Sequence, residues 1–207
     1  ATPVAYTRVP FPPYAPPPTR MVFRTPDKQN AVMQALLPVP LKEGDADYAA
    51  LMMANYLLGN GGNSRLWLRI REKDGLSYDV RSTIGWDAYG TNSWWIASAI
   101  FAPANRAKVE VAFKEELERA LKDGFTAKEL EEGKQGLLNF RNLSRAQDRN
   151  VAGAWVRNLD LGRTFAFSAT VDAQLKALTL AQVNAALRKY IEPAKFVVGF
   201  AGDFKEP

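Results

Sequence analysis

Segments that read as strands and segments that read as helices are segregated along this chain rather than strictly alternating. Apolar runs with strand character cover 21–24, 31–37, 76–87, 93–101 and 196–200. Helical spacing covers 45–58, 64–74, 103–123, 126–145, 151–161, 173–178 and 179–191. This arrangement predicts an α+β fold, in which a mainly antiparallel sheet is covered on one face by helices.

Helix boundaries are marked most clearly in the second half of the chain. Thr126 with Glu129 and Thr179 with Gln182 have the spacing of capping boxes, so each threonine is expected to begin a helix. Gly75 and Gly124 are expected to follow helix ends.

Strand faces can be predicted from the period of two. The strand 76–87 alternates, and its core-facing residues are expected to be Leu76, Tyr78, Val80, Ile84 and Trp86. The run 31–37 is expected to be buried on both faces. The tryptophans are assigned to core packing by default: Trp86, Trp94, Trp95 and Trp155.

The chain divides into two parts by composition. Residues 1–19 are rich in proline, which favours an extended linker, and residues 20–207 read as a single domain of ordinary globular composition. No apolar run is long enough to span a membrane as a helix.

Two residue types are missing altogether, because the chain contains neither histidine nor cysteine. Disulfides, thiolate metal sites and imidazole-dependent nucleophiles are thereby excluded, and a zinc site would have to be built from carboxylates alone. The net charge is +5, but basic residues alternate with acidic ones, so no nucleic-acid partner is expected.

The segment 61–78 carries the candidate chemistry. It reads as a glycine-rich turn, a short basic helix and a strand. Arg71 lies beside apolar helix neighbours, and its planar cation suits a carbonyl or a carboxylate. Tyr78 offers a hydroxyl that can donate to an oxygen on which negative charge builds. The alternative is structural: a tyrosine in the core and an arginine that caps the helix end.

The turn before this helix has two readings of its own. The loop Gly59-Asn60-Gly61-Gly62 could cradle a phosphate, but the lysine and the Ser/Thr of a P-loop are missing and no strand leads directly into it. A flexible turn between two helices is the interpretation we favour.

Three stretches together resemble one family, the pitrilysin/insulinase zinc metallopeptidases, in their second, metal-free half. They are 62–78 with its R-x6-Y spacing, the helix start 125–130, and the ending 178–202. The resemblance implies two similar halves that face each other across a chamber. It assigns Arg71 and Tyr78 to substrate orientation and oxyanion stabilisation, and it places Gly61, Gly62 and Asn63 at the chamber border.

The same resemblance implies that zinc lies on the other half, since the family motif H-x-x-E-H is absent here. This chain should have no cofactor of its own and be inactive alone. The substrate that it helps to bind in the complete peptidase is expected to be a peptide. The zinc half is expected either before Ala1 in the same polypeptide or on a partner subunit. A non-catalytic scaffold and an assembly of identical copies both stay open. Bacterial relatives favour a periplasmic or membrane-associated location.

Overall fold

The computed structural model describes residues 6–9 and 11–205, and its sheet has five strands in the order β1-β5-β2-β4-β3. Their bounds are Thr19–Arg24 (β1), Ala31–Val39 (β2), Ser77–Gly85 (β3), Ser93–Phe101 (β4) and Val197–Gly202 (β5). Only β1 and β5 pair in parallel, and the other three pairings are antiparallel. The expected mainly antiparallel α+β fold is confirmed.

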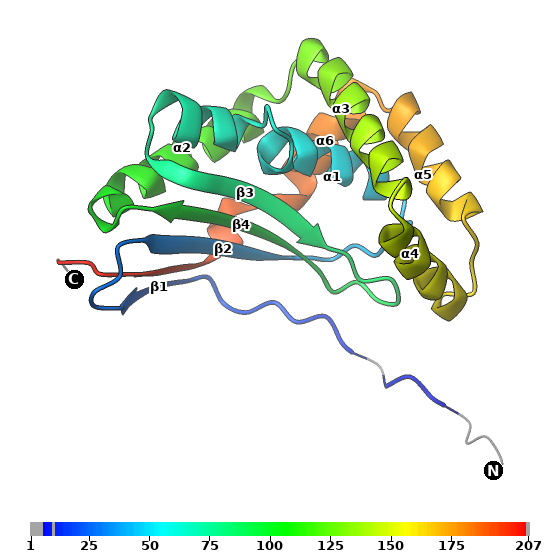
Figure 1. Cartoon of the computed structure of the whole chain (residues 1–207), viewed down its shortest axis with the longest axis horizontal. Helices are drawn as coiled ribbons and strands as arrows, with labels where there is room; N and C mark the ends of the chain where they lie inside the picture. The colour runs from blue at the N-terminus through cyan, green and yellow to red at the C-terminus, as the bar shows by residue number, and fades with distance from the viewer. Residues whose placement is uncertain (1–5, 10, 206–207) are drawn as a thin grey trace.

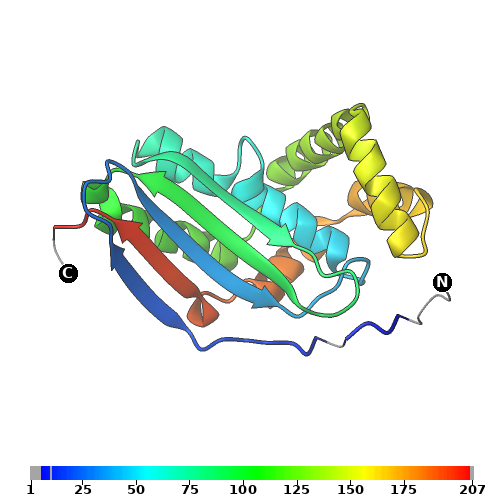
Figure 2. The ribbon, with the colours of Figure 1, turned by 60° about the horizontal axis from the view of Figure 1, so that its bottom comes forward.

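The α-helices are α1 (Tyr48–Asn55), α2 (Arg106–Asp123), α3 (Ala127–Arg145), α4 (Asp148–Asp160), α5 (Ala166–Ala177) and α6 (Leu180–Tyr190). Two π-helical turns, η1 (Tyr56–Asn60) and η2 (Trp67–Lys73), and two 3-10 turns, η3 (Pro103–Asn105) and η4 (Pro193–Lys195), complete the helical elements. Figure 1 shows α1, α2 and α6 over one face of the sheet. Figure 2 shows the opposite face open to the viewer, with α4 beyond the end of the sheet.

The core lies between the sheet and the helices that cover it. α1 is the central covering helix, because seven of its eight residues are buried. Against it packs the inner face of the sheet, whose largest fully buried side chains are Met33, Leu37, Trp95, Phe101 and Phe200. Burial of such side chains supplies the main driving force for folding.

A buried polar group ties α1 to the sheet. The side-chain oxygen of Asn55 accepts hydrogen bonds from Ser82 Oγ at 2.7 Å and from Trp95 Nε1 at 2.8 Å. Gly59 permits this close approach, because a Cβ there would lie 2.4 Å from Ser82 Oγ. η1, which contains Gly59, therefore packs directly against β3.

Three expectations about local structure were wrong. β2 is buried on one face only, and Gln34 on its other face is exposed, because that face of the sheet has no helix over it. The helix expected from 173 begins earlier, at Ala166. Trp94 and Trp155 are 42% and 58% exposed, so neither belongs to the core to which both were assigned.

The proline-rich start contacts the tip of the β3–β4 hairpin. Asn92 donates to the carbonyl oxygen of Phe11 at 2.7 Å, and the guanidinium of Arg8 lies 3.4 Å from the ring centre of Tyr89. Before Thr19, the residues that the structure describes form no helix or strand. The division into a linker and one domain stays a prediction.

Candidate functional site

Arg71 and Tyr78 lie next to each other at the start of β3. Arg71, on η2, donates from Nη1 to the backbone oxygen of Tyr78 at 2.7 Å. Its guanidinium carbon lies 4.3 Å from the ring centre of Trp67 and 5.5 Å from that of Tyr78. The cation therefore lies within reach of two aromatic rings, and these contacts restrain its orientation.

Tyr78 is not a core residue, contrary to the face predicted from the alternation. It is 78% exposed. The reason is a bulge: Ser77 pairs with Phe101 and Asp79 with Ile100, so that Tyr78 has no partner on β4. The extra residue turns Ser77 toward the core and leaves the phenol in solvent at an edge strand.

The two side chains can act as donors toward one acceptor. The side chain of Arg71 is 37% exposed, and Nη2 has no hydrogen-bond partner among the residues that the structure describes. The phenol of Tyr78 is likewise open to a ligand. A permanent cation beside a neutral hydroxyl suits a carbonyl oxygen that gains negative charge.

The glycine loop lies apart from this pair. Gly61, Gly62 and Asn63 line a separate hollow of about 230 Å³ against α3, which Arg71 and Tyr78 do not line. Glu129 on α3 closes one side of it. Burial alone would raise the pKa of Glu129, but hydrogen bonds from Arg65 and Thr126 hold the pKa below its ordinary value.

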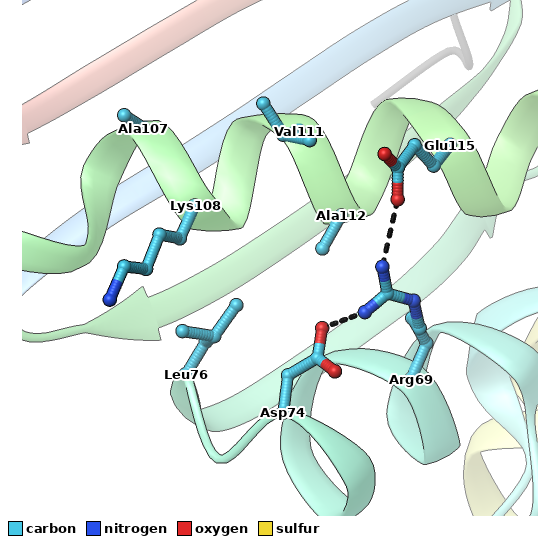
Figure 3. Close-up of a pocket in the computed structure, with 8 residues that line it drawn as sticks. All are labelled: Arg69, Asp74, Leu76, Ala107, Lys108, Val111, Ala112 and Glu115. Atoms are coloured by element: carbon cyan, nitrogen blue, oxygen red, sulfur yellow. Dashed lines mark hydrogen bonds and ion pairs between the residues drawn. The ribbon is translucent and has the colours of Figure 1, made fainter.

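Arg71 and Tyr78 do not line the hollow between η2 and α2 either. Figure 3 shows Arg69 there, donating to Asp74 and to Glu115, the latter at 2.8 Å. Two carboxylates thus neutralise its single cation, and Lys108 across the hollow offsets the remaining charge. Nothing in this hollow selects a charged ligand.

The chain does not offer a zinc site in the part that the structure describes. No three acidic side chains gather there in a way that could hold a metal ion, and histidine and cysteine are absent from the sequence. The described residues of this chain therefore do not fit a zinc ion, which the resemblance places on the other half of the peptidase.

A five-stranded, mainly antiparallel sheet with helices over one face and a bulge in its edge strand defines an α+β domain. Residues 2–137 match the family described as the peptidase M16 inactive domain, and the chain belongs to that family. This confirms the membership expected from the sequence motifs.

Similar proteins agree with this assignment. The non-peptidase homolog YmxG of Helicobacter pylori is 25% identical over 168 residues, which cover 80% of this chain and 38% of YmxG. A peptidase M16 inactive domain from Pseudomonas fluorescens superposes with a TM-score of 0.83 at 24% identity, over 96% of this chain and 46% of that one. The chain thus spans less than half the length of either protein.

Two further structures share the fold. One, from Bordetella parapertussis, is the inactive peptidase domain of a protein assigned as a zinc protease (TM-score 0.69, 18% identity, 83% of this chain and 91% of that one). The other is the periplasmic protease PqqL of Escherichia coli (TM-score 0.71, 18% identity, 89% of this chain and 20% of that one). In the described part of this chain, no helix is long and apolar enough to cross a membrane.

Proposed function

We propose that this chain is the substrate-binding and chamber-closing domain of a zinc metalloendopeptidase. One observation carries the proposal: the exposed pair of Arg71 and Tyr78 at the start of an edge strand, in a domain of the inactive M16 family. The zinc and its general base would lie on a second half, in the same polypeptide or on a partner subunit.

The pair would act by orienting the peptide and stabilising charge. Arg71 Nη2 and the Tyr78 hydroxyl would donate to the carbonyl oxygen of the scissile bond, with donation strengthening as that oxygen becomes an oxyanion. The hydrogen bond from Arg71 to the Tyr78 backbone holds both groups in one place before substrate arrives. The zinc on the other half would supply the activated water.

The open face of the sheet suits the wall of a chamber. Met21, Phe23 and Trp94 alternate with core-facing residues of β1 and β4, so they lie on this face, where they are 37%, 54% and 42% exposed. Such a surface is expected where a second layer, here a facing half with peptide between, covers it. Gly61, Gly62 and Asn63, which line a separate hollow against α3, would border the chamber at a place apart from the pair.

Co-expression tests this proposal. The chain is produced alone and together with the H-x-x-E-H segment encoded upstream or in a neighbouring gene, and cleavage of a quenched fluorescent peptide is measured. We expect no cleavage by the chain alone and chelator-sensitive cleavage by the pair. A zinc half that cleaves equally well without this chain would contradict the proposal.

A non-catalytic scaffold is the second candidate, and the name of one relative favours it, since YmxG is called a non-peptidase homolog. A scaffold needs the fold but not the Arg71–Tyr78 pair. Finding no H-x-x-E-H segment in the same polypeptide or a co-purifying partner would support the scaffold over the peptidase.

Location and other partners belong to the same proposal. We propose a periplasmic or membrane-associated protein, supported by the periplasmic protease among the similar structures. No nucleic-acid partner is proposed, and a salt-dependent gel shift should be negative. Sedimentation would show whether copies of the chain associate with one another.

A further inference from the structure

A third hollow, of about 320 Å³, lies among α3, α4 and α5, away from the Arg71–Tyr78 pair. Four arginines line it, and we call it the four-arginine pocket: Arg141 and Arg145 from α3, Arg157 from α4, and Arg163 from the connection between α4 and α5. No proposed role of the domain in peptide cleavage uses these residues.

Two carboxylates anchor the arginines without neutralising them. Glu43 accepts from Arg157 at 2.8 Å and from Arg163 at 3.1 Å. Asp172 accepts from both Arg141 and Arg145 at 2.6 Å. Four guanidinium charges against these two carboxylates leave a surplus of two positive charges.

Glu43 is ionised at neutral pH despite its surroundings. Its side chain is only 9% exposed. Burial alone would raise its pKa, but hydrogen bonds from Arg157 and Arg163 hold the pKa of Glu43 below its ordinary value. The arginines are therefore fixed in position by charged partners rather than extended freely into water.

Each arginine keeps a donor to spare. The hydrogen bonds of these four side chains, to Asn158, Ser168, Glu43 and Asp172, use only their Nε and Nη2 atoms. Within residues 6–9 and 11–205, none of the four arginines donates a hydrogen bond from its Nη1 atom. Fixed, partly satisfied guanidinium groups are the usual receptors for carboxylate and phosphate oxygens.

Apolar side chains make up much of the remaining wall. Phe140, which is 63% exposed, lines the pocket from α3, Val151 and Ala154 from α4, and Phe165 and Phe167 from the segment around the start of α5. The Arg163 guanidinium lies 3.7 Å from the ring centre of Phe167. A ligand here would meet both guanidinium cations and hydrocarbon.

We propose that the four-arginine pocket binds a small organic anion, a carboxylate or a phosphate attached to an apolar or aromatic group. The anion would accept from the unused Nη1 donors, and its apolar part would pack against the phenylalanines. The proposal does not depend on the peptidase role and would survive its failure.

Binding of matched small molecules tests the proposal. N-acetylphenylalanine, phenyl phosphate and N-acetylphenylalaninamide are titrated into the protein by NMR or calorimetry. We expect at least one of the two anions to bind in the millimolar range or tighter and the neutral amide to bind at least about tenfold more weakly. The anion with the lower dissociation constant shows whether the pocket prefers a carboxylate or a phosphate. Binding of neither anion, or equal binding of amide and acid, would overturn the proposal.

Variants locate the bound anion. The double variant Arg145→Gln/Arg157→Gln removes the more exposed arginine of each pair and leaves each carboxylate one partner. Its affinity should fall at least about tenfold, whereas Lys114→Gln/Lys128→Gln, with the same charge change on exposed helix positions, should bind normally. If the double variant does not fold, each single variant is measured. Unchanged affinity in the arginine variants would contradict the assignment.

Discussion

At the residue scale, a hydrogen bond and a ring contact fix the position of the Arg71 side chain. Arg71→Ala removes the hydrogen bond to the Tyr78 carbonyl and the packing on Trp67. We expect kcat/KM of the complete peptidase to fall about tenfold or more, since a charge-assisted hydrogen bond contributes roughly 1.5–3 kcal/mol. Lys73→Ala, on the same short helix, is the control and should leave kcat/KM unchanged.

Glu43 is a residue whose charge stabilises the fold. Its folded-state pKa is lowered from the ordinary value of 4.5, because the hydrogen bonds from Arg157 and Arg163 outweigh burial, which acts in the opposite direction. A lowered folded pKa contributes stability above the unfolded pKa, and this contribution is lost as the pH falls through the folded pKa. Glu43→Gln should therefore cost about 1–3 kcal/mol of unfolding free energy at pH 7.

The difference between wild type and Glu43→Gln should then begin to shrink as the pH falls below the ordinary pKa of 4.5. It should be lost as the pH falls through the lower pKa of Glu43 in the folded protein, where the folded carboxylate takes up its proton. Urea unfolding measured across this range provides the check. A difference that stays constant from pH 7 to pH 3 would show that the charge of Glu43 does not stabilise the fold.

Single residues also show what the sequence could not reveal. The spacing of Arg71 and Tyr78 in the sequence placed them seven residues apart, and the structure brings them into contact. The exposure of Tyr78 could not be read from alternation, because the bulge depends on pairing with β4 and on no signal within β3 itself. The four arginines of the pocket come from three separate segments, so only the folded chain brings them together.

At the scale of elements, η1 fits against β3 only because residue 59 lacks a side chain. Gly59→Ala would place a Cβ 2.4 Å from Ser82 Oγ and 2.9 Å from its backbone nitrogen. We expect a loss of about 1–3 kcal/mol in unfolding free energy, since the backbone of β3 would have to move. Gly62→Ala is the matched control, because nothing lies within 4 Å of its added Cβ. Equal stability of the two variants would contradict this account of the packing.

The start of α3 is fixed by its capping box. Thr126 Oγ1 accepts from the Glu129 backbone at 3.2 Å, while the Glu129 carboxylate accepts from the Thr126 backbone at 2.7 Å. Thr126→Ala should lower the unfolding free energy by about 0.5–2 kcal/mol. Thr170→Ala, in the exposed middle of α5, should change it little, and thermal melts of both variants would tell them apart.

Elements with strong local signals were predicted well. Both capping boxes form at the expected threonines, and all five strands lie where apolar runs occur. The early start of α5 was missed because Phe165, which directly precedes it, is not a capping residue type; Thr164 Oγ1 nevertheless accepts from the backbone nitrogen of Ala166 at 3.2 Å. Its position is set by packing, since Val171 and Leu175 are buried in the core.

At the scale of the whole molecule, segregated strands and helices were enough to predict a one-sided sheet. They were not enough to give the order β1-β5-β2-β4-β3, in which the last strand lies between the first two. That order brings residues nearly two hundred positions apart into one ladder, a pairing no local pattern encodes. The open face that results is the surface that we propose a second half covers.

The central claim is that Tyr78 donates its hydroxyl to the reacting carbonyl in a complete peptidase. Tyr78→Phe removes only that hydroxyl from a side chain that is 78% exposed, so stability and zinc content should not change. The decisive measurement is kcat for the wild-type and Tyr78→Phe complete enzymes at equal zinc content. The account predicts a fall of about a hundredfold, the cost of removing one oxyanion donor. An unchanged kcat would contradict it.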